Sequence, residues 1–368
     1  MIKILFNLEM EYHFNALYPL YYEFNQDNKY DIFFRIGKDP AKFLGLFKIS
    51  QRNKIISRLR ESNIKITEET NGFDIVVCGD ALNSPERFGD TLRIHVDHGV
   101  GIKTSRIRNI FAQKNYRYHV FLEGQYWYDY IKSLNWSDIA DFHILGIPKL
   151  DPLFWQGQYQ KTSLIKKLGI SAFKKTVLFA PSYKPSCIDY IKEKIICLTD
   201  QYNLLIKLHP YSWLGRYAPH SHHKFYQKLA LNNQDLYLIP KNDYDIYPFL
   251  NLADTLISDT SSVINEFLAL GKHGVIYVLP GKKLTHSDGM PVLSIDPEKW
   301  LKGAFLHIHT PDELVDAVAA ALNPTQQMKE KLIGYKNYLF TGLDGRSSLR
   351  VKEKVDQLIE DRLHHAGS

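Results

Sequence analysis

Cysteine is scarce in this 368-residue sequence, and long apolar runs and low-complexity tracts are absent. The three cysteines, Cys78, Cys187 and Cys197, are odd in number and show no CxxC spacing, so they predict reduced thiols of a cytosolic protein. No apolar stretch approaches the ~18 residues that a membrane-spanning helix needs. The first residues lack the layout of a signal peptide. We therefore expect a cytoplasmic protein, soluble or peripheral on the inner face of the cell membrane.

Charge of one sign is also limited, because the formal net charge is only +6. The sequence has no zinc-finger spacing, no RNA-recognition signature and no long Lys/Arg tract, so nucleic acid is not an expected partner. Aromatic residues, in contrast, are abundant at 13%, with 23 Tyr and 20 Phe. They predict either a tyrosine-rich core and surface, or contact with a membrane interface or an extended lipid-linked substrate.

The length predicts two domains of similar size. Short buried-strand patterns alternate with helical ones through both halves, which favours βαβ units and parallel sheets. We predict an α/β protein with two Rossmann-like halves, in which ligands bind beyond the carboxyl ends of the strands, in a cleft between the halves. The expected domains are residues 1–155 and 172–325, with helices in residues 326–368 packing back on the first.

A run of polar residues separates a buried strand from a helix late in the chain. The residues are Ser258, Asp259, Thr260, Ser261 and Ser262. The first N–H groups of a helix lack partners within the helix, and together with the helix dipole they attract anions. One such residue would serve as an ordinary N-cap. Five in succession exceed what capping requires, so this turn predicts a phosphate site.

A histidine follows a strand in the first half. The surrounding residues are Asp97, His98, Gly99 and Lys103. A histidine titrates near neutrality, so His98 is a candidate general base. Adjacent residues of a strand point to opposite faces, which leaves open whether Asp97 is its partner. A structural histidine with core hydrogen bonds is the alternative.

The second half contains a matching basic element, Lys207 and His209 followed by Pro210. Strand alternation would place Lys207 and His209 on the same side, where they would balance the charge of a diphosphate. A strand-end histidine before a turn proline is the simpler alternative.

Two further segments carry weaker signals. Ser182 and Lys184 lie in a proline-rich turn that would reach a phosphate, and His220, His222 and His223 lack the ligand set of a metal site.

Taken in order, these segments resemble the CDP-glycerol:polyglycerophosphate glycerophosphotransferase family, the wall teichoic acid primases and polymerases. The resemblance covers about residues 90 to 350. Val100-Gly101 stand where Thr-Pro is usual, and Thr260 replaces a common Tyr. The segments that carry it are residues 97–103, 146–151, 180–183, 207–210, 258–262 and 344–350.

The resemblance implies a GT-B fold and a reaction in which an acceptor hydroxyl attacks the β-phosphate of a CDP-polyol, glycerol being the expected polyol, and CMP leaves. His98 would be the base, and His209 with Lys207 would stabilise the diphosphate. No metal or cofactor is required, because cationic side chains and a helix end supply the positive charge. The remaining roles implied are phosphate binding by Ser261, Ser262, Arg346 and Arg350, and ribose binding by Glu266. For Arg346 and Arg350 a surface salt bridge is the alternative.

The expected acceptor is a lipid-linked or glycan hydroxyl in the synthesis of a teichoic acid-like polymer, with the basic surface on the anionic cytoplasmic leaflet. Two other enzyme classes remain open at this point. One is a nucleotide-sugar glycosyltransferase on the same fold, and the other is an isomerase that resembles UDP-N-acetylhexosamine 2-epimerase. A non-catalytic nucleotide-binding scaffold is the remaining class, against which the presence of both His98 and His209 counts.

Overall fold

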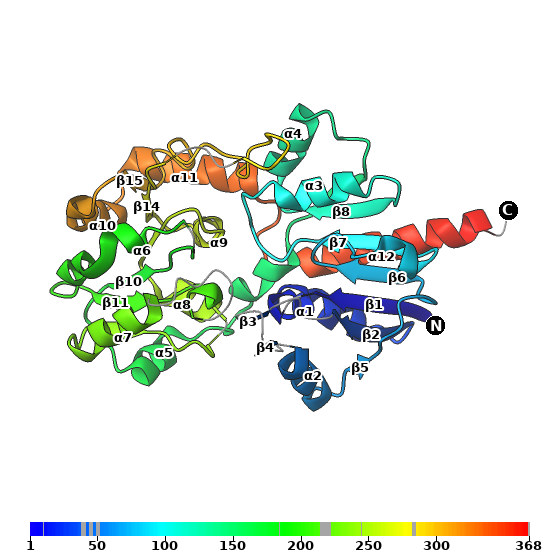
Figure 1. The fold of residues 1–368 in the computed structure, drawn as a ribbon, viewed down its shortest axis with the longest axis horizontal. Coiled ribbons are helices and arrows are strands. Elements are labelled where there is room, and N and C mark those ends of the chain that lie inside the picture. Colours follow the sequence, from blue (N-terminus) through cyan, green and yellow to red (C-terminus); the bar gives the residue numbers. More distant parts are fainter. Residues whose placement is uncertain are drawn as a thin grey trace. The chain divides into compact units, whose positions relative to one another are not determined.

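The chain forms two compact units in the computed structural model (Figure 1). Unit 1 comprises Met1–Ala41, Phe47–Trp155 and Tyr338–Ser368, and unit 2 comprises Lys42–Leu46 and Gln156–Asn337. The structure describes all residues except 10, 38–41, 44–46, 49–51, 184, 214–221, 244, 282–284 and 367–368. Lys184 and His220, which were considered above, therefore lie outside the described residues.

Unit 1 contains a parallel sheet in the order β5-β2-β1-β6-β7-β8-β9. With the two short strands β3 (Lys42–Phe43) and β4 (Phe47–Lys48) set aside, this is the 3-2-1-4-5-6 order of a Rossmann fold with one strand added. The strand order reverses between β1 and β6, which is where such sheets bind ligands. The strands are β1 (Ile2–Leu8), β2 (Tyr30–Ile36), β5 (Lys65–Ile66), β6 (Ile75–Cys78), β7 (Leu92–Val96), β8 (Tyr118–Leu122) and β9 (Asp141–Ile144).

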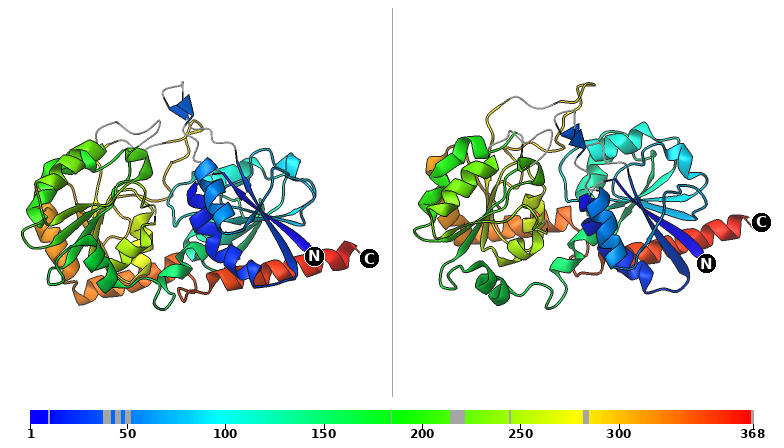
Figure 2. Two further views of the ribbon diagram at one scale, coloured as in Figure 1. Left: turned by 90° about the horizontal axis from the view of Figure 1, so that it is seen from below. Right: turned by 60° about the horizontal axis from the view of Figure 1, so that its bottom comes forward.

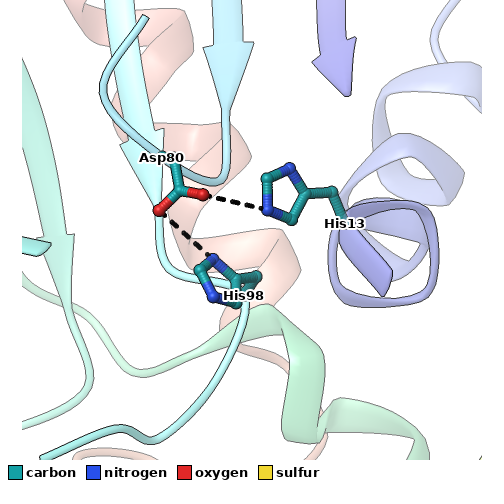
Figure 3. Close-up of side chains that lie close together, drawn as sticks. All are labelled: His13, Asp80 and His98. Carbon is teal, nitrogen blue, oxygen red and sulfur yellow. Dashed lines mark ion pairs between the residues drawn. The ribbon is translucent and has the colours of Figure 1, made fainter. Parts of the chain in front are cut away.

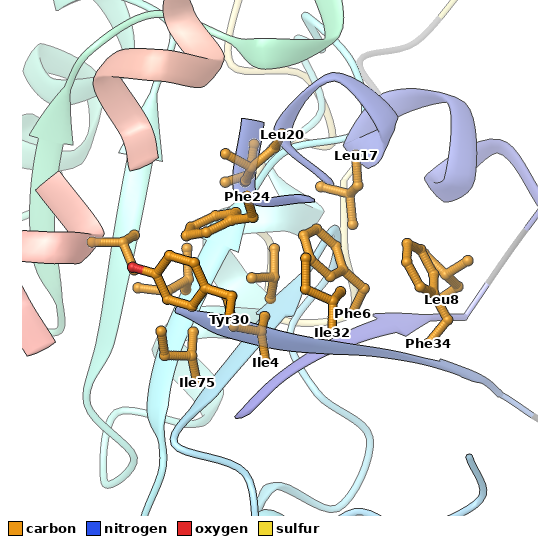
Figure 4. Close-up of a cluster of buried hydrophobic side chains, with 14 of the residues drawn as sticks. Ile4, Phe6, Leu8, Leu17, Leu20, Phe24, Tyr30, Ile32, Phe34 and Ile75 are labelled. Atoms are coloured by element: carbon orange, nitrogen blue, oxygen red, sulfur yellow. The ribbon is translucent and has the colours of Figure 1, made fainter. Parts of the chain in front are cut away.

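Strand alternation divides the side chains of this sheet between two cores. Ile4, Phe6 and Leu8 of β1 pack on one face, and Leu5 packs on the other (Figure 4). Phe6 stacks on Phe34 of β2 with ring centroids 5.0 Å apart. The first face is covered by α1 (Glu11–Asn25), α2 (Arg52–Glu61) and α12 (Ser347–Ala366), and the second by α3 (Ser105–Ala112) and α4 (Gln125–Ser133).

Unit 2 repeats the same plan with six parallel strands, in the order β12-β11-β10-β13-β14-β15. The order again reverses between the first strand and the fourth, here β10 and β13. The strands are β10 (Thr176–Phe179), β11 (Asn203–Ile206), β12 (Leu236–Leu238), β13 (Thr255–Ser258), β14 (Gly274–Tyr277) and β15 (Leu306–Ile308). The helices are α5 (Lys161–Leu168), α6 (Ile188–Ile191), α7 (His222–Leu231), α8 (Tyr247–Leu252), α9 (Val263–Ala269), α10 (Leu314–Leu322) and α11 (Gln326–Leu339).

The predicted class, α/β with two Rossmann-like parallel sheets, is confirmed. The return of the chain to unit 1 comes later than the predicted residue 326, because α11 lies in unit 2 up to Asn337. Tyr335 of this helix donates a hydrogen bond to Lys302 in unit 2, whereas Tyr338 donates one to Asp129 in unit 1. Among the described residues, the structure has no helix that is both long and apolar enough to span a bilayer.

Helix α12 packs against α1 in unit 1 (Figure 2) and begins at a buried carboxylate. Asp151 accepts hydrogen bonds from the backbone N–H groups of Ser347 (3.0 Å) and Ser348 (2.7 Å) and from the Ser348 hydroxyl (2.6 Å). A carboxylate at this position accepts hydrogen bonds from N–H groups that have no partner within the helix, and its negative charge interacts favourably with the positive end of the helix dipole. Two of the family-like segments, residues 146–151 and 344–350, therefore meet at a structural junction.

Arg350 belongs to the same junction, so its side chain already has structural partners. It donates hydrogen bonds to the carbonyl oxygens of Leu145 (3.0 Å) and Gly342 (2.6 Å) and to the carboxylate of Asp344 (2.9 Å). These contacts correct the expectation that Arg350 is a phosphate ligand. Arg346 is exposed just before α12, and its phosphate role stays a prediction.

Replacement of Asp151 by Asn tests this junction. The change leaves buried donors of Ser347 and Ser348 facing an amide, so we expect the free energy of unfolding of unit 1 to fall by about 2 kcal/mol. Urea denaturation monitored by circular dichroism measures this loss. Asp361→Asn, on the exposed side of α12, is the matched control, with an expected change within about 0.5 kcal/mol. Equal stability of the two variants would contradict the structural role of Asp151.

Candidate active site

Three loops of unit 1 meet where its strand order reverses. His13 comes from the first turn of α1 after β1, Asp80 follows β6, and His98 follows β7 (Figure 3). The Nδ1 atom of His98 lies 3.7 Å from a carboxylate oxygen of Asp80 and 3.6 Å from one of Asp97. The His98 side chain is 29% exposed. A histidine is thus held between two carboxylates with one side open to solvent.

A backbone hydrogen bond fixes the neutral tautomer of His98. Its Nδ1 atom lies 2.9 Å from the carbonyl oxygen of Gly79, which can only accept, so Nδ1 carries the proton. The lone pair of the neutral ring is then on Nε2. An imidazole in this tautomer is arranged to take a proton at Nε2, as a general base must.

Asp97 is anchored by a buried ion network. Its Oδ2 atom lies 2.7 Å from Nε of Arg106, and Arg106 donates three further hydrogen bonds, of 2.9, 3.1 and 3.1 Å, to Glu123. Arg106 also lies over the ring of Trp127, 4.7 Å from its centroid. Burial alone would raise the pKa of Asp97, but the Arg106 guanidinium outweighs it and holds this pKa below its usual range.

The structure answers the question that strand alternation left open for Asp97. Strand β7 ends at Val96, so Asp97 and His98 lie in the loop and both approach the same point. The Gly99 N–H donates to Asp97 (3.0 Å), which tightens this turn. Lys103 is exposed two residues before α3, and its acceptor-side role stays a prediction.

The spacing of His13, Asp80 and His98 also meets the requirement for a metal ion, and among the described residues no other group does so. The hydrogen bonds favour a different use. In this arrangement both imidazoles carry a proton on the nitrogen that faces Asp80, because Nδ1 of His98 donates to Gly79 and Nδ1 of His13 accepts from the Glu9 N–H at 3.3 Å. A metal ion would have to displace both protons.

In unit 2, Lys207 and His209 follow β11, which ends at Ile206. Lys207 is 7% exposed, and its ammonium, unlike its backbone N–H, makes no hydrogen bond to a described residue. Burial lowers the pKa of Lys207, while the carboxylates of Asp243 and Asp245 act in the opposite direction. A buried cation without such a partner marks a candidate site for an anionic ligand.

Lys272 shows the contrast with a structural lysine. Its ammonium donates to the carbonyl oxygens of Leu250, Asn251 and Ala253 at 2.7 to 3.0 Å, at the end of α8. Burial, with Lys161 nearby, lowers the pKa of Lys272 to about 7. Its donors are all used in the fold, whereas those of Lys207 are not.

The neutral ring of His209 is arranged as a hydrogen-bond donor at Nε2, not as an acceptor. Its Nδ1 atom accepts the Tyr211 N–H at 3.1 Å, so the neutral ring carries its proton on Nε2. Tyr183 and Tyr211 flank the ring, with centroids 4.5 and 5.3 Å away. Lys207 and His209 are therefore both donors, which is the chemistry that a phosphate oxygen requires.

The predicted phosphate turn divides into two parts. The Ser258 hydroxyl donates to the Ala180 carbonyl oxygen (2.6 Å), and the Asp259 carboxylate accepts the N–H groups of Ser182 and Cys187 (2.8 Å each). Burial raises the pKa of Asp259, and these two donors oppose that rise. Ser258 and Asp259 therefore join the loops after β10 and β13 and are not positioned as phosphate ligands, a correction to the expectation from sequence.

Thr260, Ser261 and Ser262 are the half-buried members of the turn and keep their predicted role. Ser182 is used within its own loop, because its hydroxyl donates to the Pro185 carbonyl oxygen at 2.6 Å. Glu266 is 2% exposed inside α9. Its role in ribose binding stays a prediction.

The histidines in and beside α7 have separate partners. His222 lies 3.0 Å from the Asp189 carboxylate, and His223 bonds to the Ser212 carbonyl oxygen at 3.1 Å. The two rings therefore do not converge.

Sequence reasoning missed His13, Asp80, Arg106 and Glu123. Asp80 obeys the rule that selected His98, since it follows a buried strand directly. His13 lies within a helix, where no such rule applies. Arg106 and Glu123 could be found only from their mutual contact.

Comparison with known proteins agrees with this geometry. Residues 94–357 match the model of the family described as CDP-Glycerol:Poly(glycerophosphate) glycerophosphotransferase. The teichoic acid ribitol-phosphate polymerase TarL of Staphylococcus aureus is 27% identical over 224 residues, which is 56% of this chain and 35% of that protein. The chain thus spans about a third of the length of this curated relative.

Among solved structures, the wall teichoic acid polymerase TagF superposes with a TM-score of 0.65 at 15% identity, over 98% of this chain and 90% of that one. A putative UDP-N-acetylglucosamine 2-epimerase from Listeria monocytogenes gives 0.61 at 14% identity, over 98% and 97%. These likenesses support the GT-B class of fold. With the family match over residues 94–357, they lead to one assignment: the chain belongs to the CDP-glycerol:poly(glycerophosphate) glycerophosphotransferase family.

Proposed function

We propose that the protein transfers a polyol phosphate, glycerol phosphate in the first instance, from a CDP-polyol to a hydroxyl of a lipid-linked or glycan acceptor. The observation that carries the proposal is the largely buried Lys207, which precedes the proton-donating His209 by two residues after β11, within the family segment. Such a pair suits a diphosphate whose charge grows as CMP departs. The relative TarL is named a teichoic acid ribitol-phosphate polymerase, and this likeness supports teichoic acid synthesis as the proposed context.

In the proposed reaction, Nε2 of His98 takes the proton of the acceptor hydroxyl as its oxygen attacks the β-phosphorus of the donor. The bond between that phosphorus and the bridging oxygen breaks, and CMP leaves with the electron pair. The Asp80 and Asp97 carboxylates lie 3.7 and 3.6 Å from Nδ1, and negative charge at this position stabilises the imidazolium that forms, with the charge of Asp97 partly offset by Arg106.

Unit 2 would bind the leaving group. Lys207 and Nε2–H of His209 would donate to the diphosphate oxygens, and Thr260, Ser261 and Ser262 would add hydroxyl and backbone donors before α9. The rings of Tyr183 and Tyr211 flank His209 and limit its rotation. All these groups are present before reaction, as electrostatic stabilisation of a leaving group requires.

A donor screen tests the reaction class. Purified protein with a lipid-linked disaccharide acceptor should release CMP from CDP-glycerol or CDP-ribitol, and mass spectrometry should find the acceptor heavier by one or more polyol phosphate units. UDP-N-acetylglucosamine serves as the control donor. Turnover of the UDP-sugar alone would replace the proposal by a glycosyltransferase or a 2-epimerase.

His98→Asn tests the base. We expect kcat to fall by about 10²- to 10⁴-fold while CMP binding is retained, because the variant loses only the group that accepts the proton. Rapid-quench turnover and calorimetric CMP titration measure the two quantities. His119→Asn, a carboxylate-paired histidine in β8 of the same sheet, is the matched control and should keep wild-type turnover. Unchanged kcat in His98→Asn would remove the assignment.

Lys207→Met tests the leaving-group site. The variant keeps most of the buried volume but loses the cation, so we expect kcat/KM for the CDP-polyol to fall on the order of 100-fold and CMP binding to weaken. Lys228→Met, at an exposed position of α7, is the control for loss of a positive charge. Equal effects of the two substitutions would mean that Lys207 contributes only to the net charge.

A further inference from the structure

Two residues that contact His98 lie before the segment matched by the family, which begins at residue 94. The ring of His13 packs on that of His98, with centroids 4.7 Å apart and an angle of 31° between the planes. Asp80 lies 3.7 Å from Nδ1 of His98 through one oxygen and 3.2 Å from Nε2 of His13 through the other (Figure 3). A carboxylate therefore stands between two imidazoles.

The contacts of His13 make it a fixed, neutral partner of Asp80. Its side chain is completely buried, and its Nδ1 atom accepts the Glu9 N–H, so the proton is on Nε2 and faces Asp80. Burial lowers the pKa of His13 despite the neighbouring carboxylate. A neutral imidazole can orient Asp80 without cancelling its charge.

Asp80 remains an anion. Burial alone would raise its pKa, but the bond from His13 and the neighbouring rings hold the pKa of Asp80 below its usual range. Asp97, the second carboxylate beside His98, is already paired with Arg106 at 2.7 Å. His95, buried behind these groups, is neutral because burial lowers its pKa to about 4. Among the described residues, the carboxylate beside His98 that is not paired with Lys or Arg is thus Asp80.

We propose that His13 and Asp80 are positioning residues of His98, with Asp80 orienting the base and stabilising its protonated form, and His13 holding Asp80 in place. This inference rests on the proposed role of His98 as the general base. It assigns a function to the beginning of α1 and to the loop after β6, both of which precede the family segment.

The arrangement predicts opposite pH effects for two substitutions. Asp80→Asn removes the anion that favours the imidazolium of His98, so the base stays neutral at lower pH. The acidic limb of the pH profile of kcat therefore moves to lower pH by about one pH unit. His13→Phe keeps a ring against His98 but removes the donor to Asp80. The carboxylate then stabilises the protonated form of His98 more strongly, and the acidic limb moves to higher pH by about half a pH unit.

Both substitutions should lower kcat on the order of 10- to 100-fold, with KM for the CDP-polyol within about twofold of wild type, because they misplace the base without touching the donor site. His13→Gln retains an N–H near the position of Nε2 and should restore the wild-type profile. His119→Phe, which changes a carboxylate-paired histidine elsewhere in the sheet, should leave the profile unchanged.

Titration of ¹⁵N-histidine-labelled protein by NMR gives a readout that does not depend on turnover. The His98 ring should titrate at lower pH in Asp80→Asn and at higher pH in His13→Phe than in wild type, with thermal melting used to verify that each variant is folded. Identical His98 titrations in the three folded proteins would overturn the inference. If no CDP-polyol is turned over by wild type, the proposed function fails, and the NMR result still decides whether His13 and Asp80 act on His98.

Discussion

Buried carboxylates that accept backbone N–H groups hold the family-like loops of both units in place. Asp97 accepts the N–H of Gly99, Asp259 accepts those of Ser182 and Cys187, and Asp151 accepts those of Ser347 and Ser348. Asp97 and Asp259 follow strands and Asp151 lies in a short 3₁₀ helix, and the N–H groups that they accept have no partner in the sheet. An unpaired carboxylate in such a place would be costly, so each loop is held by the donors that satisfy its own aspartate.

Exposure to solvent distinguishes the aspartates that hold these loops from the histidines that are candidates for the reaction. Asp97 and Asp259 are almost inaccessible, at 5% and 2% exposure, whereas His98 and His209 are partly open to solvent. Lys207 is the exception, since the residue is buried and its ammonium still makes no hydrogen bond to a described residue. A cation in that situation gains most from an anionic ligand, and this is the physical basis for placing the diphosphate in unit 2.

The sequence alone predicts the two parallel sheets, because alternating buried strands and helices in each half permit few other arrangements. It also selects His98, Lys207 and His209, which follow strands directly. It does not distinguish an aspartate that binds a ligand from one that turns inward, and for that reason Asp259 was expected to contact phosphate. Nor does it reveal His13 beside His98, because that contact depends on the order β1-β6-β7 in the sheet.

The same strand order explains why the environment of His98 extends beyond the family segment. Strand β7, which precedes His98, pairs with β6, and β6 pairs with β1, so the loops after all three strands end at one edge. Asp97 reaches His98 from its own loop, but Arg106 neutralises it. A carboxylate with an uncancelled charge must then come from a neighbouring strand, and Asp80 after β6 is in that position. His13 after β1 completes the set as a neutral donor, which orients the charge without reducing it.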